Sequence, residues 1–199
     1  MRYTGPKRRL SRREGIALFK KDEKSIERKG AVPPGQRGTK VRPRVTGYGT
    51  QLREKQKAKR MYGLAERQFR KTFDEAAKRK GATGETFLQF LETRLDNVIF
   101  RLGLARSRPE ARQYVSHGHV TVDGKKVNIP SYRVRANQVV AISQKFVHNT
   151  QIAKNLGEDM VVPEWLEKKA TVGKVVRLPY RDEMEKAIQE QLIVEYYSR

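Results

Sequence analysis

The clearest pattern in the sequence is a series of apolar residues at helical spacing in the middle of the chain. The first set precedes Gly81 and consists of Phe69, Phe73, Ala76 and Ala77. A second stripe begins after Glu85 and consists of Phe87, Leu88, Leu91, Leu95, Val98, Ile99 and Leu102. Residues three or four apart lie on one side of a helix, so each set predicts an amphipathic helix with a buried face. The second helix is predicted to continue without a break to Gly103.

A capped helix is predicted directly after this stripe. Ser107 and Glu110 have the spacing of a capping box, and the intervening Pro109 is tolerated in a first helical turn. The apolar side of this helix consists of Ala111, Tyr114 and Val115. Another face carries a polar row at positions i, i+4 and i+8 that consists of Arg108, Arg112 and Ser116.

Strands are predicted to follow this helix. Residues 119–122 alternate as a half-buried strand does, and the Asp-Gly pair at 123–124 favours a two-residue hairpin turn. The return strand is predicted to include Val127 and Ile129, and a further strand covers residues 138–142. Helix, turn, helix, hairpin and strand within about 50 residues indicate a compact α+β module.

The remaining segments have weaker patterns. Residues 51–63 have helical propensity and stop at a glycine, and residues 151–156 and 182–191 also favour helix. Residues 172–178 can form a strand. The apolar residues of 192–196 fit both the helical and the strand period, so their spacing leaves both open.

The charge of the chain indicates which kind of partner it binds. The 199 residues include 44 Lys and Arg but 22 Asp and Glu, a net charge of +22 at pH 7 that favours a polyanionic partner such as nucleic acid or an anionic membrane. The first 60 residues contain 20 basic and five acidic side chains, a surplus of 15. They are also rich in glycine and proline and poor in large apolar residues, so we expect a basic arm that does not fold well alone.

Several classes of protein are excluded or disfavoured by composition. The sequence has no cysteine, which excludes disulfides, thiolate zinc sites and cysteine nucleophiles. No stretch approaches the roughly 18 apolar residues of a membrane-spanning helix, and the start lacks the apolar run of a signal peptide. We therefore expect a cytoplasmic protein with no membrane partner.

Candidate metal and nucleotide sites are poorly supported. His117 and His119 lie two residues apart with no acidic or cysteine neighbour, so a helix end followed by a strand start explains them better than a metal site does. Gly47 and Gly49 form a lone glycine pair, and the sequence has no Walker lysine pattern. Neither a metal nor a nucleotide cofactor is predicted.

The triplet Arg94-Leu95-Asp96 is similar to one that carries the catalytic aspartate of some pseudouridine synthases. It falls in the middle of the predicted helix of residues 85–102, so we interpret Asp96 as making a local hydrogen bond or ion pair. A synthase would also need a catalytic domain for which the rest of the chain has little room. No catalytic residue is predicted, and the chain is not expected to be an enzyme.

Three observations favour RNA as the polyanion. The positive charge exceeds what solubility requires, and the arginines of residues 106–112 surround a predicted helix N-terminus whose amides can hold phosphate. The polar residues Gln113, Ser116 and His117 flank them. Charge alone does not separate RNA from DNA, but no recognition helix or dimer seam for the major groove stands out.

The run RLDNVIFRLGLARSRPEARQYVSHGHVTVDGKKVNIPSYRV closely resembles the RNA-binding module of the S-four family of small-subunit ribosomal proteins. That module also occurs in tRNA synthetases, pseudouridine synthases and heat-shock RNA binders. The flanking segments RYTGPKRRLSRREG, PPGQRG, YGTQLREKQKAKRMYGLAERQFRK and QLIVEYYSR are similar to the bacterial ribosomal family itself. The resemblance therefore covers essentially the whole chain.

The resemblance implies an α+β fold with a mostly helical domain, a small α/β RNA-binding module and an extended basic N-terminal arm. The module consists of a helix-turn-helix followed by antiparallel strands. The implied boundaries are 1–45 for the arm, 46–89 with 178–199 for the helical domain, 90–150 for the module and 151–177 for a connecting segment. The final segment is helical in the family. Many relatives hold zinc with four cysteines in the arm, but this chain has residues such as Arg8 and Ser11 there, so no zinc is expected.

The resemblance also implies a function. Members of the family are structural constituents of the small ribosomal subunit that bind the 5′ domain of 16S ribosomal RNA, nucleate assembly of the subunit body and contribute to translational accuracy. The implied partners are this RNA, ribosomal proteins five and twelve, and messenger RNA where it enters the subunit. The alternative is an RNA-modifying enzyme, similar to a pseudouridine synthase, that uses the same module.

The predicted RNA contacts form three groups. Those of the arm are Arg2, Tyr3, Lys7, Arg8, Arg9, Arg12, Arg13, Arg37, Lys40 and Arg44. Those of the helical domain are Gln51, Arg53, Lys55, Gln56, Lys57, Arg60, Arg67 and Arg70. Those of the module are Arg106, Ser107, Arg108, Arg112, Gln113, Ser116, His117 and Lys125. We expect them to recognise the shape of a branched RNA, with an affinity that falls steeply as salt rises.

Overall fold

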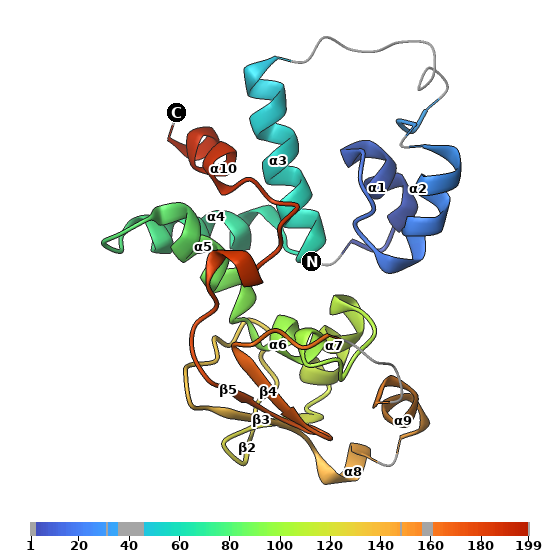
Figure 1. Ribbon diagram of the computed structural model, residues 1–199, viewed down its shortest axis with the longest axis vertical. Helices are drawn as coiled ribbons and strands as arrows, with labels where there is room; N and C mark the ends of the chain where they lie inside the picture. Colours follow the sequence, from blue (N-terminus) through green and yellow to red (C-terminus); the bar gives the residue numbers. More distant parts are fainter. Residues whose placement is uncertain (1–2, 31, 36–45, 148, 157–160, 199) are drawn as a thin grey trace. The chain divides into compact units, whose positions relative to one another are not determined.

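The computed structural model describes residues 3–30, 32–35, 46–147, 149–156 and 161–198. The chain divides into two compact units (Figure 1). Met1–Lys78 and Ala187–Arg199 form the first unit, so both ends of the chain belong to it, and Arg79–Lys186 form the second. The finer division into arm, helical domain, module and connecting segment stays a prediction.

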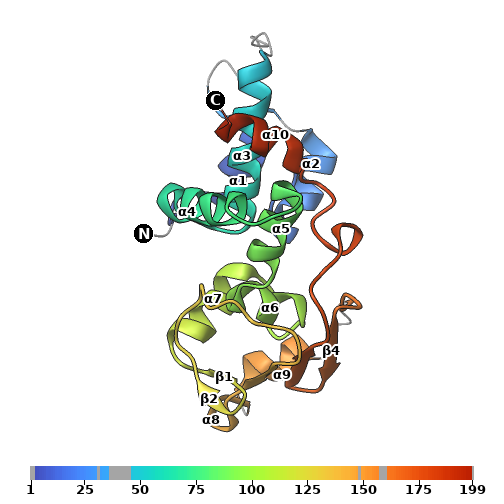
Figure 2. The same cartoon turned by 90° about the vertical axis from the view of Figure 1, so that its left-hand side faces the viewer.

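The first unit is helical. Its elements are α1 (Lys7–Glu14), the 3₁₀ helix η1 (Lys20–Asp22), α2 (Glu23–Lys29), α3 (Gly47–Met61), α4 (Glu66–Ala77) and α10 (Glu190–Tyr197). Helix α3 starts before the predicted position, because the side chain of Thr46 accepts a hydrogen bond from the Gly49 amide at 3.1 Å and caps the helix. The final segment is helical, as the family resemblance implies, and α10 packs beside α3 (Figure 2).

Part of the basic arm is helical rather than extended. Helices α1 and α2 lie within it, and local polar contacts explain why they form. The buried Ser11 hydroxyl donates to the Asp22 carboxylate and accepts from the Leu18 amide, which ties the first helix to the turn that follows it. Gly15 ends α1 with a left-handed φ of 78°, the conformation that glycine adopts most readily.

Aromatic side chains hold α10 in place. The ring centroid of Tyr197 lies 4.6 Å from that of Phe73 and 6.5 Å from that of Phe69, and both phenylalanines are buried. The Lys55 ammonium of α3 lies 4.6 Å from the centre of the Tyr196 ring and 5.8 Å from that of Tyr197. The predicted apolar face at Phe69 and Phe73 is confirmed, and the end of the chain covers it.

The second unit joins helices to a five-stranded sheet. Its helices are α5 (Thr83–Glu92), α6 (Leu95–Arg101), α7 (Arg108–Ser116), α8 (Gln144–Val147), α9 (Thr150–Leu156) and the 3₁₀ helix η2 (Arg181–Glu183). Its strands are β1 (Val120–Val122), β2 (Lys125–Lys126), β3 (Val139–Ile142), β4 (Leu166–Lys169) and β5 (Val172–Val175). The strand order is β2-β1-β3-β5-β4, with every neighbouring pair antiparallel. The predicted α+β class, with a helix pair followed by antiparallel strands, is confirmed.

One face of this sheet packs against α6 and α7. The shared core includes Leu102 from the end of α6, Val115 from α7, Val120 from β1 and Val140 from β3, all fully buried. Trp165, the only tryptophan of the sequence, belongs to the same core. The helix pair and the sheet therefore form one rigid body within this unit, and the side chains on their outer surfaces are held at fixed angles.

The hairpin between β1 and β2 has the predicted turn. Asp123 and Gly124 both have positive φ angles, 50° and 77°, as a type I′ turn requires. The Asp123 carboxylate also accepts hydrogen bonds from the Val139 amide at 2.9 Å and from Gln138 Nε2 at 2.8 Å. The turn is thereby tied to β3, which fixes the register of the hairpin.

The prediction of one continuous helix over residues 85–102 is wrong. The chain leaves the helical path at Thr93 and Arg94 and separates α5 from α6. A crossing segment takes up the backbone groups there, since the Thr93 carbonyl accepts from the Val134 amide at 2.9 Å and the Leu95 amide donates to the Tyr132 carbonyl at 2.8 Å. The apolar stripe runs across the break because both helices bury the same side, so spacing alone did not reveal it.

The triplet Arg94-Leu95-Asp96 therefore lies at a helix start, not in the middle of a helix. Arg94 Nε and Nη2 donate to the two carboxylate oxygens of Asp96 at 3.0 and 2.8 Å, and both side chains are buried. The predicted local ion pair of Asp96 is confirmed. Arg112 Nη1 lies 3.6 Å from the same carboxylate, which connects α7 to the start of α6.

Other predicted elements differ in their limits. Strand β2 ends before Val127, Ile129 is 56% exposed, and β5 ends at Val175. Strand β4 was not predicted, because its sequence LEKK has one apolar residue and looks like a solvated segment. The predicted helix over 182–191 is wrong, because the Gln189 amide donates to Glu54 at 2.8 Å and α10 begins only at Glu190.

We expect Arg94→Ala to destabilise the second unit by about 3 kcal/mol, because Asp96 would remain buried with only the looser Arg112 pair. Urea unfolding followed by the fluorescence of Trp165 would measure this loss. Arg135→Ala, which removes an exposed arginine from the same unit, is the matched control and should change stability by less than about 0.5 kcal/mol. Equal effects of the two variants would contradict a structural role for Arg94.

The pKa of Glu66 generates a second prediction. Burial disfavours its charged form, but hydrogen bonds from Lys55 and Lys59 at 2.7 and 2.8 Å outweigh burial and lower the pKa from 4.5 to about 2. The carboxylate should therefore stabilise the first unit fully above pH 4.5 and progressively less as the pH falls toward 2. Urea unfolding followed by circular dichroism should show that Glu66→Gln lowers the free energy of unfolding at pH 6 and that the difference shrinks at pH 3.

Asp74→Asn is the control for this experiment, because Asp74 is exposed on the same helix. Its effect on the free energy of unfolding should be small and should not follow this pH dependence. A Glu66→Gln effect that stays constant between pH 6 and pH 3 would contradict the stabilising role of the ionised carboxylate.

Candidate nucleic-acid interface

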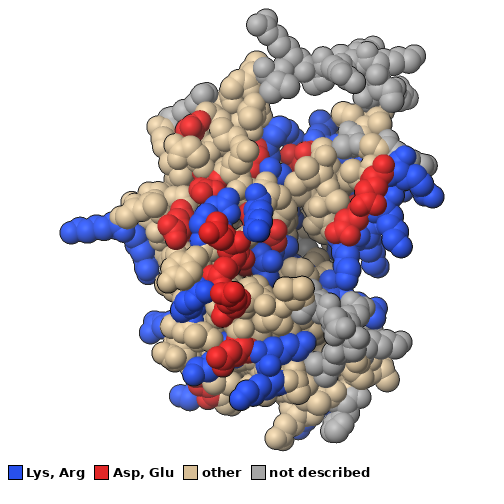
Figure 3. All heavy atoms as spheres, in the orientation of Figure 1, with Lys and Arg blue, Asp and Glu red and all other residues tan. Residues whose placement is uncertain are grey.

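The basic residues of the arm are largely on the surface. Figure 3 shows Lys and Arg side chains gathered over α1 and α2, and the exposed members in α1 are Lys7, Arg8, Arg9 and Arg13. Arg12 is only half-buried but is held by the backbone, since its Nε donates to the Val32 carbonyl at 2.7 Å. Tyr3 is 50% exposed. The predicted contacts Arg2, Arg37, Lys40 and Arg44 lie outside the described residues.

Two arginines of α3 are paired with a carboxylate of the arm. Glu14, the last residue of α1, has a buried side chain that lies 3.3 Å from Arg53 and also bonds to Arg60. Burial raises the pKa of Glu14, although the neighbouring positive charges of Arg60 and Arg53 oppose this change. These two predicted RNA contacts therefore connect α1 to α3 within the first unit.

Other predicted contacts on α3 also have internal partners. Gln51 donates to Glu195 at 2.8 Å, Lys57 pairs with Glu54 at 2.7 Å, and the buried Lys55 pairs with Glu66. Gln56 is half-buried on the same helix, and Arg67 and Arg70 are exposed on α4. The basic character of α3 thus contributes to the packing of the helical unit as well as to its surface.

The start of α7 is capped by the chain itself. The Ser107 hydroxyl accepts from the Glu110 amide at 3.4 Å, and the Glu110 carboxylate accepts from the Arg106 amide at 2.8 Å and from the Tyr114 hydroxyl at 2.6 Å. The predicted N-cap is confirmed. Because Ser107 and Glu110 already engage amide groups at this end, the backbone alone does not form the phosphate site that the sequence suggested.

Arg108 belongs to an internal network. Its Nε donates to Asn97 Oδ1 at 2.8 Å, its guanidinium bonds to Glu185, and its central carbon lies 4.7 Å from the centre of the Phe100 ring. Arg101 also donates to Glu185, at 3.1 Å. Arg108 therefore fastens the segment near Glu185 to α6 and α7, a role that its position in the polar row did not reveal.

The polar face of α7 keeps several side chains on the surface. Arg106, Gln113, Ser116 and His117 are exposed, whereas Arg112 is half-buried through its pair with Asp96. They form a surface along α7 that can face a phosphate backbone. The hydrogen-bonding residues Gln113, Ser116 and His117 can add positioning contacts to it.

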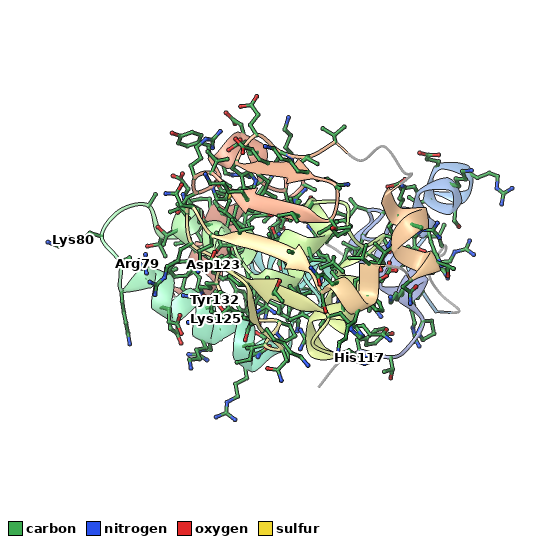
Figure 4. All side chains as sticks on the ribbon, turned by 90° about the horizontal axis from the view of Figure 1, so that it is seen from below. Arg79, Lys80, His117, Asp123, Lys125 and Tyr132 are labelled. Carbon is green, nitrogen blue, oxygen red and sulfur yellow. The ribbon has the colours of Figure 1, made fainter. Side chains whose placement is uncertain are left out.

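Lys125 lies away from this surface. It is exposed at the hairpin tip beside the Asp123 turn, and Figure 4 shows it on the opposite side of the unit from His117. The next residue, Lys126, reaches the end of α7 instead, where its side chain lies against Gly118. His119, considered above only as a metal ligand, stacks on Phe146 beside this point. Sequence reasoning did not group Lys126 with His119, because only the hairpin register brings them together.

Two further findings concern other kinds of site. Within the part of the chain that the structure describes, no group of three or more His, Asp or Glu side chains could hold a metal ion. Among the same residues, no helix is long and apolar enough to cross a membrane. The candidate site is the set of basic surfaces on α1 and α4 and next to the two ends of α7.

Two family models match residues 2–140 of the chain. Residues 2–92 match the family described as the ribosomal protein S4/S9 N-terminal domain, and residues 93–140 match the S4 domain. The S4 match includes α6, α7 and the first three strands at least in part, which are the elements that carry the α7 surface.

Similar proteins are named small ribosomal subunit protein uS4. The one from Dictyoglomus turgidum is 52% identical over 205 residues, and the one from Thermoanaerobacter sp. strain X514 is 52% identical over 206 residues. The one from Thermus thermophilus is 47% identical over 207 residues. Each alignment covers 100% of this chain and 99% of the relative. The chain belongs to the uS4 family of small ribosomal subunit proteins.

Proposed function

We propose that this protein binds the 5′ domain of 16S ribosomal RNA directly and early, and that this binding nucleates assembly of the body of the small subunit. The observation that carries the proposal is the placement of charge on the two units. Exposed basic residues lie on α1 and α4 and next to the two ends of α7, where Arg106 and His117 are exposed, while the carboxylates Glu14, Glu66 and Asp96 are engaged by other basic residues. Each such pair neutralises one charge of either sign, so the surplus of positive charge stays with the residues outside the pairs.

The mode of binding follows from the rigidity of these surfaces. In the second unit, α7 is fixed on the sheet by a common core, so Arg106, Gln113 and His117 are presented at a constant angle. A branched RNA offers phosphates from several helices at angles that one duplex does not offer. The fixed side chains of the second unit therefore respond to the three-dimensional layout of the RNA rather than to its base sequence.

The proposal extends to neighbours within the subunit. We infer that the protein adjoins ribosomal proteins five and twelve and the path by which messenger RNA enters the subunit, and that it thereby contributes to translational accuracy. Family membership over the full length of the chain supports this inference. Crosslinking within assembled subunits would test each neighbour separately.

The main rival is an RNA-modifying enzyme that uses the same module. Membership of a family of structural ribosomal proteins argues against it, and the protein is not an enzyme. The one aspartate with a sequence context similar to that of a synthase, Asp96, is buried and bound to Arg94 through both carboxylate oxygens. A catalytic nucleophile would need to reach a base, which this geometry does not allow.

A binding competition tests the proposal. The full chain should bind a transcript of the 5′ domain more tightly than a linear RNA duplex of equal length, at one fixed salt concentration. Chemical footprinting should give protections at a junction of several helices, and the mass of the bound RNA should stay unchanged. Equal affinity for the duplex would overturn recognition of RNA layout, and a change in RNA mass would favour the enzyme.

For the α7 surface, we expect Arg106→Gln to weaken binding to this transcript by about 1 to 2 kcal/mol, the scale of a lost charge-assisted contact. Because one phosphate contact is lost, the slope of log affinity against log salt should also become shallower by about one. Lys174→Gln is the matched control, since Lys174 is exposed on β5 of the same unit. Its affinity and salt slope should match those of the unaltered protein, and identical losses in both variants would refute a specific role for Arg106.

A further inference from the structure

Three basic side chains gather where α7 ends and β1 begins. His117 is the C-cap of α7, His119 precedes β1, and their ring centroids are 5.9 Å apart. Lys126 approaches the same place from β2. We call His117, His119 and Lys126 the Gly118 cluster, after the residue between the histidines. It contains the two histidines for which no metal site is predicted and Lys126, which was not among the predicted RNA contacts.

Gly118 makes the approach of Lys126 possible. A methyl group at this position would stand 2.2 Å from Cε and 2.8 Å from Nζ of Lys126. Gly118 also has a φ of 71°, which disfavours any residue with a side chain. The ammonium group of Lys126 therefore lies directly against the backbone that joins the two histidines.

The sheet register places Lys126 and His119 on one face. Thr121 of β1 is paired with Lys126 of β2, and His119 comes two residues before Thr121. Alternate residues of a strand share a face, so the side chains of His119 and Lys126 lie on the same side of the sheet. The cluster is a product of the hairpin and not of neighbouring positions in the sequence.

The ring of His119 is held in one orientation. It stacks on Phe146 of α8 with a centroid distance of 3.9 Å and an angle of 5° between the planes. The backbone carbonyl of His119 also accepts from the Ser143 amide at 2.8 Å. A stacked imidazole keeps its nitrogen atoms at the ring edge, where a ligand can accept hydrogen bonds from them.

The groups around His119 disfavour its charged form in the free protein. Burial lowers the pKa of His119, and the positive charges of His117 from α7 and Lys126 from β2 lower it further. From α8 it meets the apolar Phe146 ring, beyond which Tyr114 donates its hydroxyl to Glu110. Exposed Lys145 is the charged residue of α8.

We propose that the Gly118 cluster is a binding site for a backbone phosphate of the RNA, and that occupation of this site is coupled to the uptake of a proton by His119. This inference rests on the proposed function and names a site within it. A phosphate among three like-charged groups removes the repulsion that opposes protonation and accepts hydrogen bonds from both histidines and from the ammonium. The bound state therefore favours imidazolium at His119.

The coupling has a defined sign. The pKa of His119 is low in the free protein and higher in the complex, so a proton is taken up on binding at pH values between the two. Affinity should rise as the pH falls through this window and should level off below it. At higher pH, where His119 is neutral in both states, binding should take up no proton.

Calorimetry can measure how many protons are taken up on binding. Binding of the full chain to the 5′ domain transcript would be measured at fixed salt, from pH 6 to pH 8, in pairs of buffers with different ionisation enthalpies. We expect proton uptake of a fraction of one near pH 6.5 and about a threefold to tenfold gain in affinity between pH 8 and pH 6. Affinity that does not change with pH, with no buffer dependence of the heat, would overturn the coupling.

Four variants assign the effect. His119→Gln should abolish the proton uptake and flatten the dependence of affinity on pH, and Lys126→Met should reduce the uptake because His119 would already be easier to protonate in the free protein. Lys174→Met removes the same charge from β5 and should leave the uptake unchanged. The fluorescence of Trp165 would verify that each variant is folded. Uptake that survives in His119→Gln but disappears in His117→Gln would overturn the assignment to His119.

The outcome separates this inference from the function on which it rests. If the unaltered protein does not bind the transcript at any pH, the proposed function fails. If it binds with the expected preference over a duplex but takes up no proton, only the coupled site at the Gly118 cluster fails.

Discussion

The fold depends on ion pairs between carboxylates and part of the basic residues. In a chain with a net charge of +22, folding brings like charges closer together, which disfavours the compact state. Glu14 pairs α1 with α3, Glu66 pairs α4 with α3, and Asp96 pairs α6 with α7. The side chains of Glu14 and Asp96 are buried, where a low local dielectric strengthens such pairs and makes the loss of one partner costly. These few acidic residues therefore hold together helices whose surfaces would otherwise repel one another.

The basic residues fall into two groups, those paired with carboxylates and those exposed on the surface. The position of a residue in the fold, and not whether it is Lys or Arg, decides to which group it belongs. Arg53 and Arg108 are bound to carboxylates, whereas Lys7 and Arg9 are exposed on α1. The paired residues set the angles at which the helices of each unit present the exposed ones. The proposed recognition of RNA shape requires constant angles, and a paired arginine such as Arg108 supports it by holding α7 against α6.

Local signals in the sequence predicted local structure well. The Ser107 cap, the Asp-Gly turn at 123–124 and the apolar face at Phe69 all depend on residues close together in the chain, and all three are present. The break at Thr93 and the partner of Arg108 depend on segments far along the chain, near Val134 and Glu185. Spacing cannot reveal them, because an arginine in a polar row looks the same whether it faces solvent or a distant carboxylate.

The Gly118 cluster gives another example of what residue spacing cannot predict, because only one of two neighbouring lysines belongs to it. Lys125 is opposite Val122 and Lys126 is opposite Thr121, so the two side chains leave opposite faces of the hairpin. Only Lys126 reaches the histidines, and a shift of one residue in register would exchange the two lysines. The positive φ angles of Asp123 and Gly124, together with the hydrogen bonds from β3 and Gln138 to Asp123, prevent this shift. The composition of the anion site is therefore determined by a turn that itself need not touch the anion.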